Sequence, residues 1–509
     1  MAGRLVRHLR TNRFRGRGAR LFVVFLAGLL APRAAAQEED LTRIEPTPAA
    51  QAASTFRSSD DFRVELLAAE PLVQDPVVLK YDEDGRAFVA EMADYPYTDR
   101  KFDRPWSDQP SPPAGRIRVL TDEDGDGVFD HSVIFADGIS WPTGLAFWNG
   151  GVYVAATPDL WYFKDTDGDL RADVRRRVFT GFRKYNVQAV MNNLQWGPDH
   201  YIYGAGGSNG GTITAPGRPD VPPVVLGRHD FRFDPRREIL EVLPGGARFG
   251  NTFNDGGDRF ICNIRNPLRY CLLPGDAAAR QLPFPPELAV VDAAPSGDLL
   301  PVYRVSPPEP WRVINARRLA ANRLRYSPRS EMNATGYVTS ACGVTIYRGA
   351  AYPSKYRGNA FIAEVAGNLV MRYRLHKEGV LWKAEHVLRD GRREFLASTD
   401  NWHRPVNFIN APDGTLHMVD MYRQTIEHPW SIPDDLKARL DLLRGRRRGR
   451  IYRLVPPEYA AGYQPPPPPR LSHASTFELV QLLDSPHSWW RDTAQRLLWE
   501  RRDPMASEA

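Results

Sequence analysis

Short runs of alternating apolar and polar residues, each entered through a tight turn, recur along most of the chain. In the clearest copy the turn Pro412-Asp413-Gly414 leads into Leu416 and Met418 and ends at Asp420. A turn of this kind followed by a two-residue period is typical of a strand leaving a hairpin. Five earlier copies share the pattern, at residues 84–91, 149–156, 198–205, 257–263 and 358–364.

Six such copies predict an all-β fold, a six-bladed β-propeller over residues 56–457. We interpret each copy as the first strand of a blade, which would line the central axis. Four copies end on a polar residue that would lie at the channel mouth, namely Glu91, Asn263, Glu364 and Asp420. These side chains either solvate the channel and hold structural water, or form a binding site where strand ends converge.

Both ends of the predicted propeller begin or finish with a strand-like alternation. Residues 62–67 and residues 451–455 are the first and last such segments. Pairing them in one blade would close the ring and remove open sheet edges.

The character of the chain changes after the propeller. Residues 458–470 form a proline-rich linker, and residues 471–509 predict a helical hairpin that resembles part of a HEAT-like repeat. Ser475 and Glu478 have the spacing of a capping box at the start of the first helix. Because repeat units of this kind are stable only when stacked, we expect the hairpin to pack on the propeller.

The N-terminal segment predicts export. Residues 1–36 combine eight arginines, an apolar core at 21–31 and small residues at 34–36, which is typical of a secretory signal peptide. The apolar core is too short to span a bilayer, so no transmembrane helix is expected after its removal. We expect a periplasmic or cell-surface location, with residues 37–55 as a flexible lead-in.

Removing this segment changes the charge. The formal charge of +6 includes its eight arginines, so the remaining chain carries −2. This balance argues against nucleic acid as a partner.

The three cysteines are too few for a disulfide scaffold; Cys262 and Cys271 either pair or are buried thiols. No Cys-x-x-Cys-His occurs, so this chain carries no covalent haem.

Two aspartate-rich loops are candidate calcium sites. Oxygen ligands spaced by two residues on a tight turn converge on a hard cation. In a solvated hairpin tip, by contrast, the same aspartates bond their own backbone. The first loop contains Asp122, Asp124, Asp126 and Asp130, and the second contains Asp165, Asp167, Asp169 and Asp173.

Longer motifs extend across the predicted propeller. They include residues 89–96, 186–197, 340–349, 395–402 and 420–433, the last reading Asp-Met-Tyr-Arg-Gln-Thr-Ile-Glu-His-Pro-Trp-Ser-Ile-Pro. Through them the chain from about residue 62 to 457 resembles the membrane-bound dehydrogenase family of PVC-type bacteria, relatives of the glucose/sorbosone dehydrogenase propellers. Members often continue into helical repeats and a haem domain.

The resemblance implies a dehydrogenase that holds pyrroloquinoline quinone (PQQ) with calcium at the channel mouth. Arg265-Asn266-Pro267 resembles an element that the sugar dehydrogenases place beside the quinone, and a guanidinium suits its carboxylates. On the same basis the candidate cofactor-binding residues are Arg265, Asn266, Glu91, Asn263, Arg404 and Arg423.

The chain departs from these relatives at the catalytic base. They carry a histidine shortly before a Gly-Pro-Asp turn, but no histidine occurs in residues 186–196 before Gly197. Removing a hydroxyl proton needs a base, and the candidates are His403, Glu364 and Asp420. One hypothesis is therefore an exported quinoprotein-type dehydrogenase that oxidises a sugar or alcohol and passes electrons to a separate acceptor such as a cytochrome. The other is a non-catalytic propeller that binds a carbohydrate or a partner protein.

Overall fold

The computed structural model describes residues 41–97, 112–273, 289–322, 329–457 and 464–507. The predicted signal peptide lies outside these residues. Among them, no helix is long and apolar enough to cross a bilayer.

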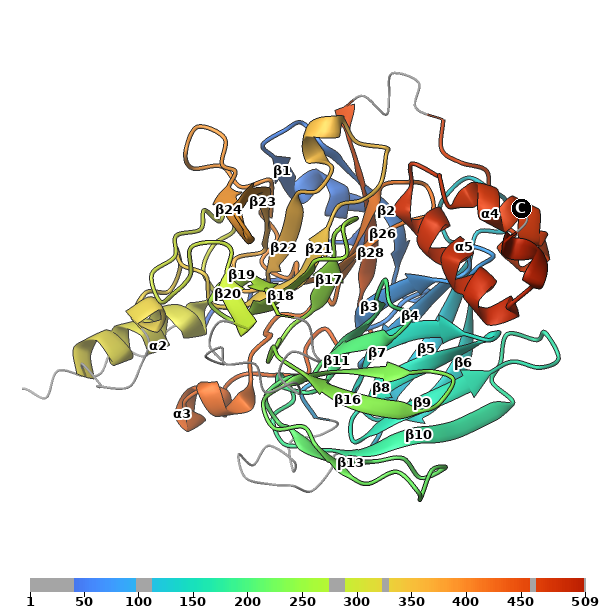
Figure 1. Cartoon of the computed structure of the whole chain (residues 1–509). Coiled ribbons are helices and arrows are strands. Elements are labelled where there is room, and N and C mark those ends of the chain that lie inside the picture. The colour runs from blue at the N-terminus through green and yellow to red at the C-terminus, as the bar shows by residue number, and fades with distance from the viewer. Residues whose placement is uncertain (1–40, 98–111, 274–288, 323–328, 458–463, 508–509) are drawn as a thin grey trace, which may run out of the picture. The chain divides into compact units, whose positions relative to one another are not determined.

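Six antiparallel sheets form the blades of a propeller (Figure 1). The first blade consists of β3 (Pro76–Tyr81), β4 (Ala87–Glu91), β5 (Gly115–Thr121) and β6 (His131–Ile139). The second consists of β7 (Pro142–Trp148), β8 (Gly151–Ala156), β9 (Asp159–Lys164) and β10 (Val174–Phe182), and is extended by β13 (Gly211–Thr214) and β14 (Val224–Val225). The third consists of β11 (Asn192–Trp196), β12 (Ile202–Ala205), β15 (Asp230–Asp234) and β16 (Ile239–Leu243).

The other three blades complete the ring. The fourth blade consists of β17 (Asn251–Phe253), β18 (Arg259–Asn263), β19 (Asn266–Cys271) and β20 (Val290–Asp292). The fifth consists of β21 (Ala341–Ile346), β22 (Ala360–Glu364), β23 (Leu369–Glu378), β24 (Leu381–His386), β25 (Leu396–Ser398) and β1 (Phe56–Ser58). The sixth consists of β26 (Pro405–Asn410), β27 (Leu416–Asp420), β28 (Arg450–Val455) and β2 (Arg63–Ala69). The six-bladed prediction is confirmed.

The innermost strand of each blade precedes the one that the sequence pattern identifies. Strands β3, β7, β11, β17, β21 and β26 contact one another in a closed ring around the axis. The repeated turn-and-strand copies are instead the second strands, so their interpretation as axial strands was wrong. The tight turn joins the first strand to the second, and the clean alternation begins only after that turn.

The last residues of the second strands still lie at one end of the axis. Glu91 is opposite Pro76, Glu364 is opposite Ala341, and Asp420 is opposite Pro405. They therefore lie where the innermost strands begin, but one strand farther out from the axis.

The predicted closure is confirmed. Strand β2 pairs antiparallel with β28, and Arg63 is opposite Val455. Residues 41–55 also pack on the propeller: the Trp402 indole donates to the Ile44 carbonyl at 2.8 Å, and a 3-10 helix, η1, spans Ala49–Thr55. This part of the lead-in is held in place, contrary to the prediction of a flexible segment.

Two helices follow the propeller and pack on it. The first, α4 (Thr476–Leu482), begins with the predicted capping box of Ser475 and Glu478, and α5 (Ser488–Arg501) follows. Their apolar side chains join one buried cluster with strands β3, β4, β27 and β28. The Trp490 indole also donates to the Pro412 carbonyl at 2.9 Å.

Insertions between strands cover the end of the axis where the second strands finish. Helix α2 (Pro310–Asn322) and the 3-10 helix η4 (Arg329–Met332) lie between β20 and β21. The 3-10 helix η6 (Pro429–Ser431) and the short helix α3 (Asp434–Lys437) lie between β27 and β28. Of these, α2, η4 and η6 supply side chains to the site described next.

Candidate functional site

A cavity of ≈ 380 Å³ opens at this end of the axis. We call it the axial cavity. All six blades contribute lining residues from their innermost strand or from the segment just before it: Val77, Thr143, Asn193, Arg248, Cys342 and Val406. The volume is within the range of small-molecule sites.

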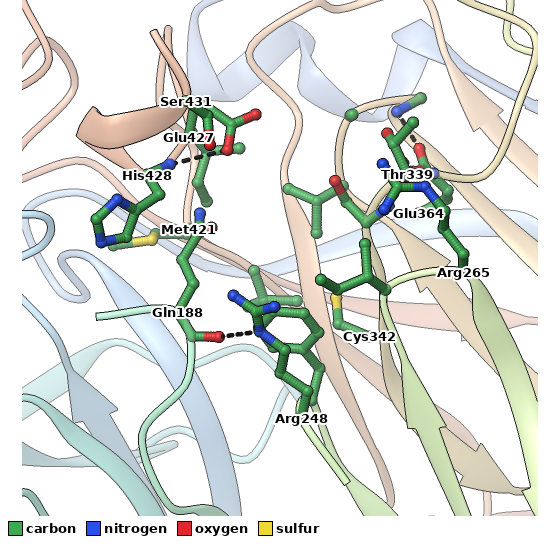
Figure 2. Close-up of a pocket in the computed structure, with 18 of the residues that line it drawn as sticks. Gln188, Arg248, Arg265, Thr339, Cys342, Glu364, Met421, Glu427, His428 and Ser431 are labelled. Atoms are coloured by element: carbon green, nitrogen blue, oxygen red, sulfur yellow. Dashed lines mark hydrogen bonds between the residues drawn. The ribbon is translucent and has the colours of Figure 1, made fainter. Parts of the chain in front are cut away.

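Arg248 supplies a half-buried charge to this cavity. Its Nε donates to the Gln188 carbonyl at 2.9 Å, which fixes the guanidinium (Figure 2). Among the residues that the structure describes, no carboxylate forms an ion pair with it, and its terminal amino groups remain available to a ligand. Burial lowers the pKa of Arg248, partly offset by Glu427, but a guanidinium stays charged at neutral pH.

The other arginines of the axial cavity already have partners. Arg265 pairs with Glu331 at 2.7 Å, and Arg312 pairs with Glu427 at 3.1 Å. Arg304 donates to neutral oxygens, including Asn368 Oδ1 at 3.0 Å, and burial lowers its pKa to about 10. Arg248 is therefore the arginine with the most hydrogen-bonding capacity left for an anion.

Glu364 places a carboxylate in the wall of the same cavity. It accepts hydrogen bonds from the backbone N–H groups of Thr339 at 3.0 Å and Ser340 at 2.8 Å, and from Gly367. These donors hold the side chain in one orientation at the end of β22. Among His403, Glu364 and Asp420, only Glu364 lines the cavity.

His428 also lines the cavity, from the segment after β27. Its Nδ1 accepts the backbone N–H of Trp430 at 3.1 Å, and its backbone N–H donates to Glu427 at 2.9 Å. Sequence reasoning missed both Arg248 and His428. Two features of the sequence could have identified them. His428 lies in the motif at 420–433, and Arg248 lies just before an innermost strand.

His403 and Asp420 are brought together, but inside the propeller. The His403 Nδ1 lies 2.7 Å from Asp420 Oδ2, and Asp420 Oδ1 accepts the backbone N–H groups of Arg404 and Tyr422. The imidazole packs edge-on against Phe56 with ring centroids 4.9 Å apart. Neither residue lines the axial cavity.

The remaining cofactor candidates are mostly bound to other protein groups. Glu91 is buried and accepts from Arg118 at 2.6 Å. Arg404 pairs with Glu309, and Arg423 pairs with Asp75, both at 2.8 Å and both fully buried. Asn266 donates to Asp292 at 3.3 Å, and Asn263 is opposite Asn266 in a strand pair. Of the six candidates, only Arg265 lines the cavity.

The aspartate loops lie at equivalent outer hairpins, β5–β6 and β9–β10. Oxygens of three aspartates in each loop lie within 4.8 Å of one another: Asp122, Asp124 and Asp130, and Asp165, Asp167 and Asp173. Asp126 and Asp169 lie outside these clusters and accept backbone N–H groups of Val128 and Arg171. The clustered aspartates also accept backbone N–H groups of their own loops, as a solvated hairpin tip would. The cysteines are free, which decides the open question about Cys262 and Cys271.

A family model described as a domain of unknown function, DUF7133, matches residues 48–458. The chain belongs to this family. No curated protein matches the sequence.

Solved structures with a similar arrangement include sugar dehydrogenases. An oxidoreductase of Thermus thermophilus described as a glucose dehydrogenase is 15% identical, with 77% of this chain and 100% of that chain covered and a TM-score of 0.42. The PQQ domain of pyranose dehydrogenase from Coprinopsis cinerea is 12% identical, with 81% and 98% covered and a TM-score of 0.42. The aldose sugar dehydrogenase of Escherichia coli is 12% identical, with 78% and 99% covered and a TM-score of 0.40. At these values the likeness carries no argument about activity.

Proposed function

We propose that this protein is an exported quinoprotein-type dehydrogenase that oxidises a sugar or alcohol in the axial cavity. The observation that supports this most is the Arg248 guanidinium, held by the Gln188 carbonyl and turned toward a cavity of small-molecule size. A fixed cation with free amino groups in a partly desolvated site binds carboxylates strongly. An organic anion is therefore the ligand class that this cavity fits.

PQQ, a tricarboxylate, fits that description. Arg248 would hold one carboxylate directly. Arg265 is 21% exposed, and besides Ser330 and Asp298 it binds the half-exposed Glu331. It can exchange Glu331 for a carboxylate of the ligand at small cost and keep its other two partners. When bound, the quinone supplies a two-electron acceptor for the substrate.

Glu364 is the group that would take the hydroxyl proton. It lines the cavity, and its backbone donors orient it without neutralising it. A carboxylate in hydrogen-bond reach of a substrate hydroxyl acts as a general base. The electrons would then pass to a separate acceptor such as a cytochrome, since this chain has no Cys-x-x-Cys-His of its own.

The test is reconstitution of the purified protein with PQQ and calcium. We expect the protein to acquire the absorbance of the quinone and to reduce an artificial dye with at least one member of a panel of sugars and alcohols. A heat-unfolded sample serves as the control for free quinone. Binding of a sugar without dye reduction would instead indicate the non-catalytic carbohydrate-binding propeller.

Calcium at the outer hairpins is a separate part of the proposal. Three carboxylates at such short distances repel one another. An ion that binds between them only in the folded state therefore raises the melting temperature. We expect calcium to raise, and a chelator to lower, the melting temperature of quinone-free protein by a few degrees. The Asp124→Ala variant should lose this response, and Asp126→Ala, whose carboxylate lies outside the three-aspartate cluster, should keep it. An identical response in both variants would contradict the assignment.

A further inference from the structure

The His428 imidazole has a fixed tautomer. A backbone N–H can only donate, so the hydrogen bond from Trp430 N at 3.1 Å requires Nδ1 to carry no proton. In the neutral ring the proton is then on Nε2. The ring is also held by an edge contact with Trp430, with centroids 4.4 Å apart and planes at 66°.

Nε2–H has no protein acceptor among the residues that the structure describes. His428 is 6% exposed and lines the axial cavity from the segment after β27 (Figure 2). A buried ring of this kind ordinarily pairs both nitrogens. The unused donor is therefore available to a ligand in the cavity.

From this arrangement we infer that His428 binds a ligand oxygen as a neutral hydrogen-bond donor through Nε2–H, and that it does not act as the proton acceptor. This inference rests on the proposed use of the axial cavity. It separates the roles of Glu364 and His428 in the cavity: Glu364 accepts, and His428 donates. With Arg248, it favours a ligand that presents a carboxylate and a second acceptor oxygen, such as a carbonyl.

The charges around the ring support the neutral form. Burial, and after it the positive charges of Arg248 and Lys437, lower the pKa of His428 to about 4. The carboxylate of Glu427 accepts from the His428 backbone N–H and pairs with Arg312. Protonation would also place a donor against the Trp430 N–H. The ring therefore stays neutral across the range in which an ordinary histidine titrates.

The tautomer can be tested without a ligand. In protein labelled with ¹⁵N-histidine, we expect the His428 resonances to report a protonated Nε2 and an unprotonated Nδ1, unchanged between pH 8 and pH 5. The His428→Asn variant identifies the resonances by their absence. A titration of His428 with a midpoint near pH 6.5 would overturn the inference.

The donor role is tested with PQQ, whose binding is followed by quenching of the cavity tryptophans Trp311 and Trp430. His428→Asn keeps an oxygen for the Trp430 N–H but lacks the donor at the Nε2 position, whereas His428→Gln can place an amide N–H near that position. We expect about tenfold weaker binding for Asn and a change within about threefold for Gln. Wild-type affinity should show no step between pH 5.5 and pH 8.

The outcomes separate this inference from the proposed function. Equal affinity of wild type and His428→Asn would overturn the donor role and leave the quinone site standing. An affinity step near pH 6.5 that His428→Asn abolishes would show that the ring titrates, and would likewise overturn it. Failure of the wild-type protein to bind PQQ would remove both proposals.

Discussion

Replacing Arg248 by alanine is expected to weaken PQQ binding by about 30- to 1000-fold. Truncating one partner of a desolvated, hydrogen-bonded charge pair costs about 2–4 kcal/mol. Among the residues that the structure describes, this guanidinium makes one hydrogen bond, to the Gln188 carbonyl, and one ring contact, with Phe249, so the free energy of unfolding should change little. Fluorescence titration of the variant, with its urea unfolding curve, measures both quantities.

Two variants give this prediction its controls. Arg248→Lys keeps the charge but loses the paired N–H donors, so it should fall between wild type and alanine. Arg265→Ala removes the arginine of the Arg-Asn-Pro element, whose half-exposed partner Glu331 leaves it a weaker contribution, less than about tenfold. If Arg265→Ala lost more affinity than Arg248→Ala, the tripeptide would be the main anion site and Arg248 a bystander.

Part of the fold could be predicted from the sequence, and part could not. Turn chemistry is local, so turns built from Gly, Asp, Asn and Pro identified one strand in each of the six blades, and the alternation at the chain ends identified the closing pair. The innermost strands were missed because they do not alternate cleanly. Their register shifts near the start, between Pro76 and Val78, between Pro142 and Gly144, and between Pro405 and Asn407.

The site residues were missed for a different reason. Arg265, Arg404 and Arg423 stood out because they belong to motifs, yet whether an arginine is available depends on which carboxylates the fold brings to it. Asp75 lies 348 positions from Arg423 in the sequence, and Glu309 lies 95 positions from Arg404. No local pattern reveals such pairs, and Arg248 is distinguished from these arginines by pairing with no carboxylate in the described part of the chain.

We expect Asp420 to stabilise the sixth blade. Replacing it by alanine is expected to lower the free energy of unfolding by about 3–5 kcal/mol, as when one partner of a buried charged network is removed. The variant would leave the backbone N–H groups of Arg404 and Tyr422 and the His403 ring without their acceptor, in a region closed to water. Urea unfolding measures the loss.

The isosteric variant separates this structural role from catalysis. Asp420→Asn keeps an oxygen for the two backbone N–H groups, and the new amide can donate to His403 Nδ1 in the tautomer that leaves this nitrogen unprotonated. We expect it to lose less than half the stability lost by alanine, and to keep PQQ affinity and dye reduction near the wild-type values. Asp420 does not line the axial cavity, whereas Glu364 does, so Glu364→Gln should abolish dye reduction while PQQ still binds. If the Asp420→Asn protein were stable and bound PQQ but reduced no dye, the His403–Asp420 pair would take part in the reaction. A path for the proton from the cavity to the buried imidazole would then be required.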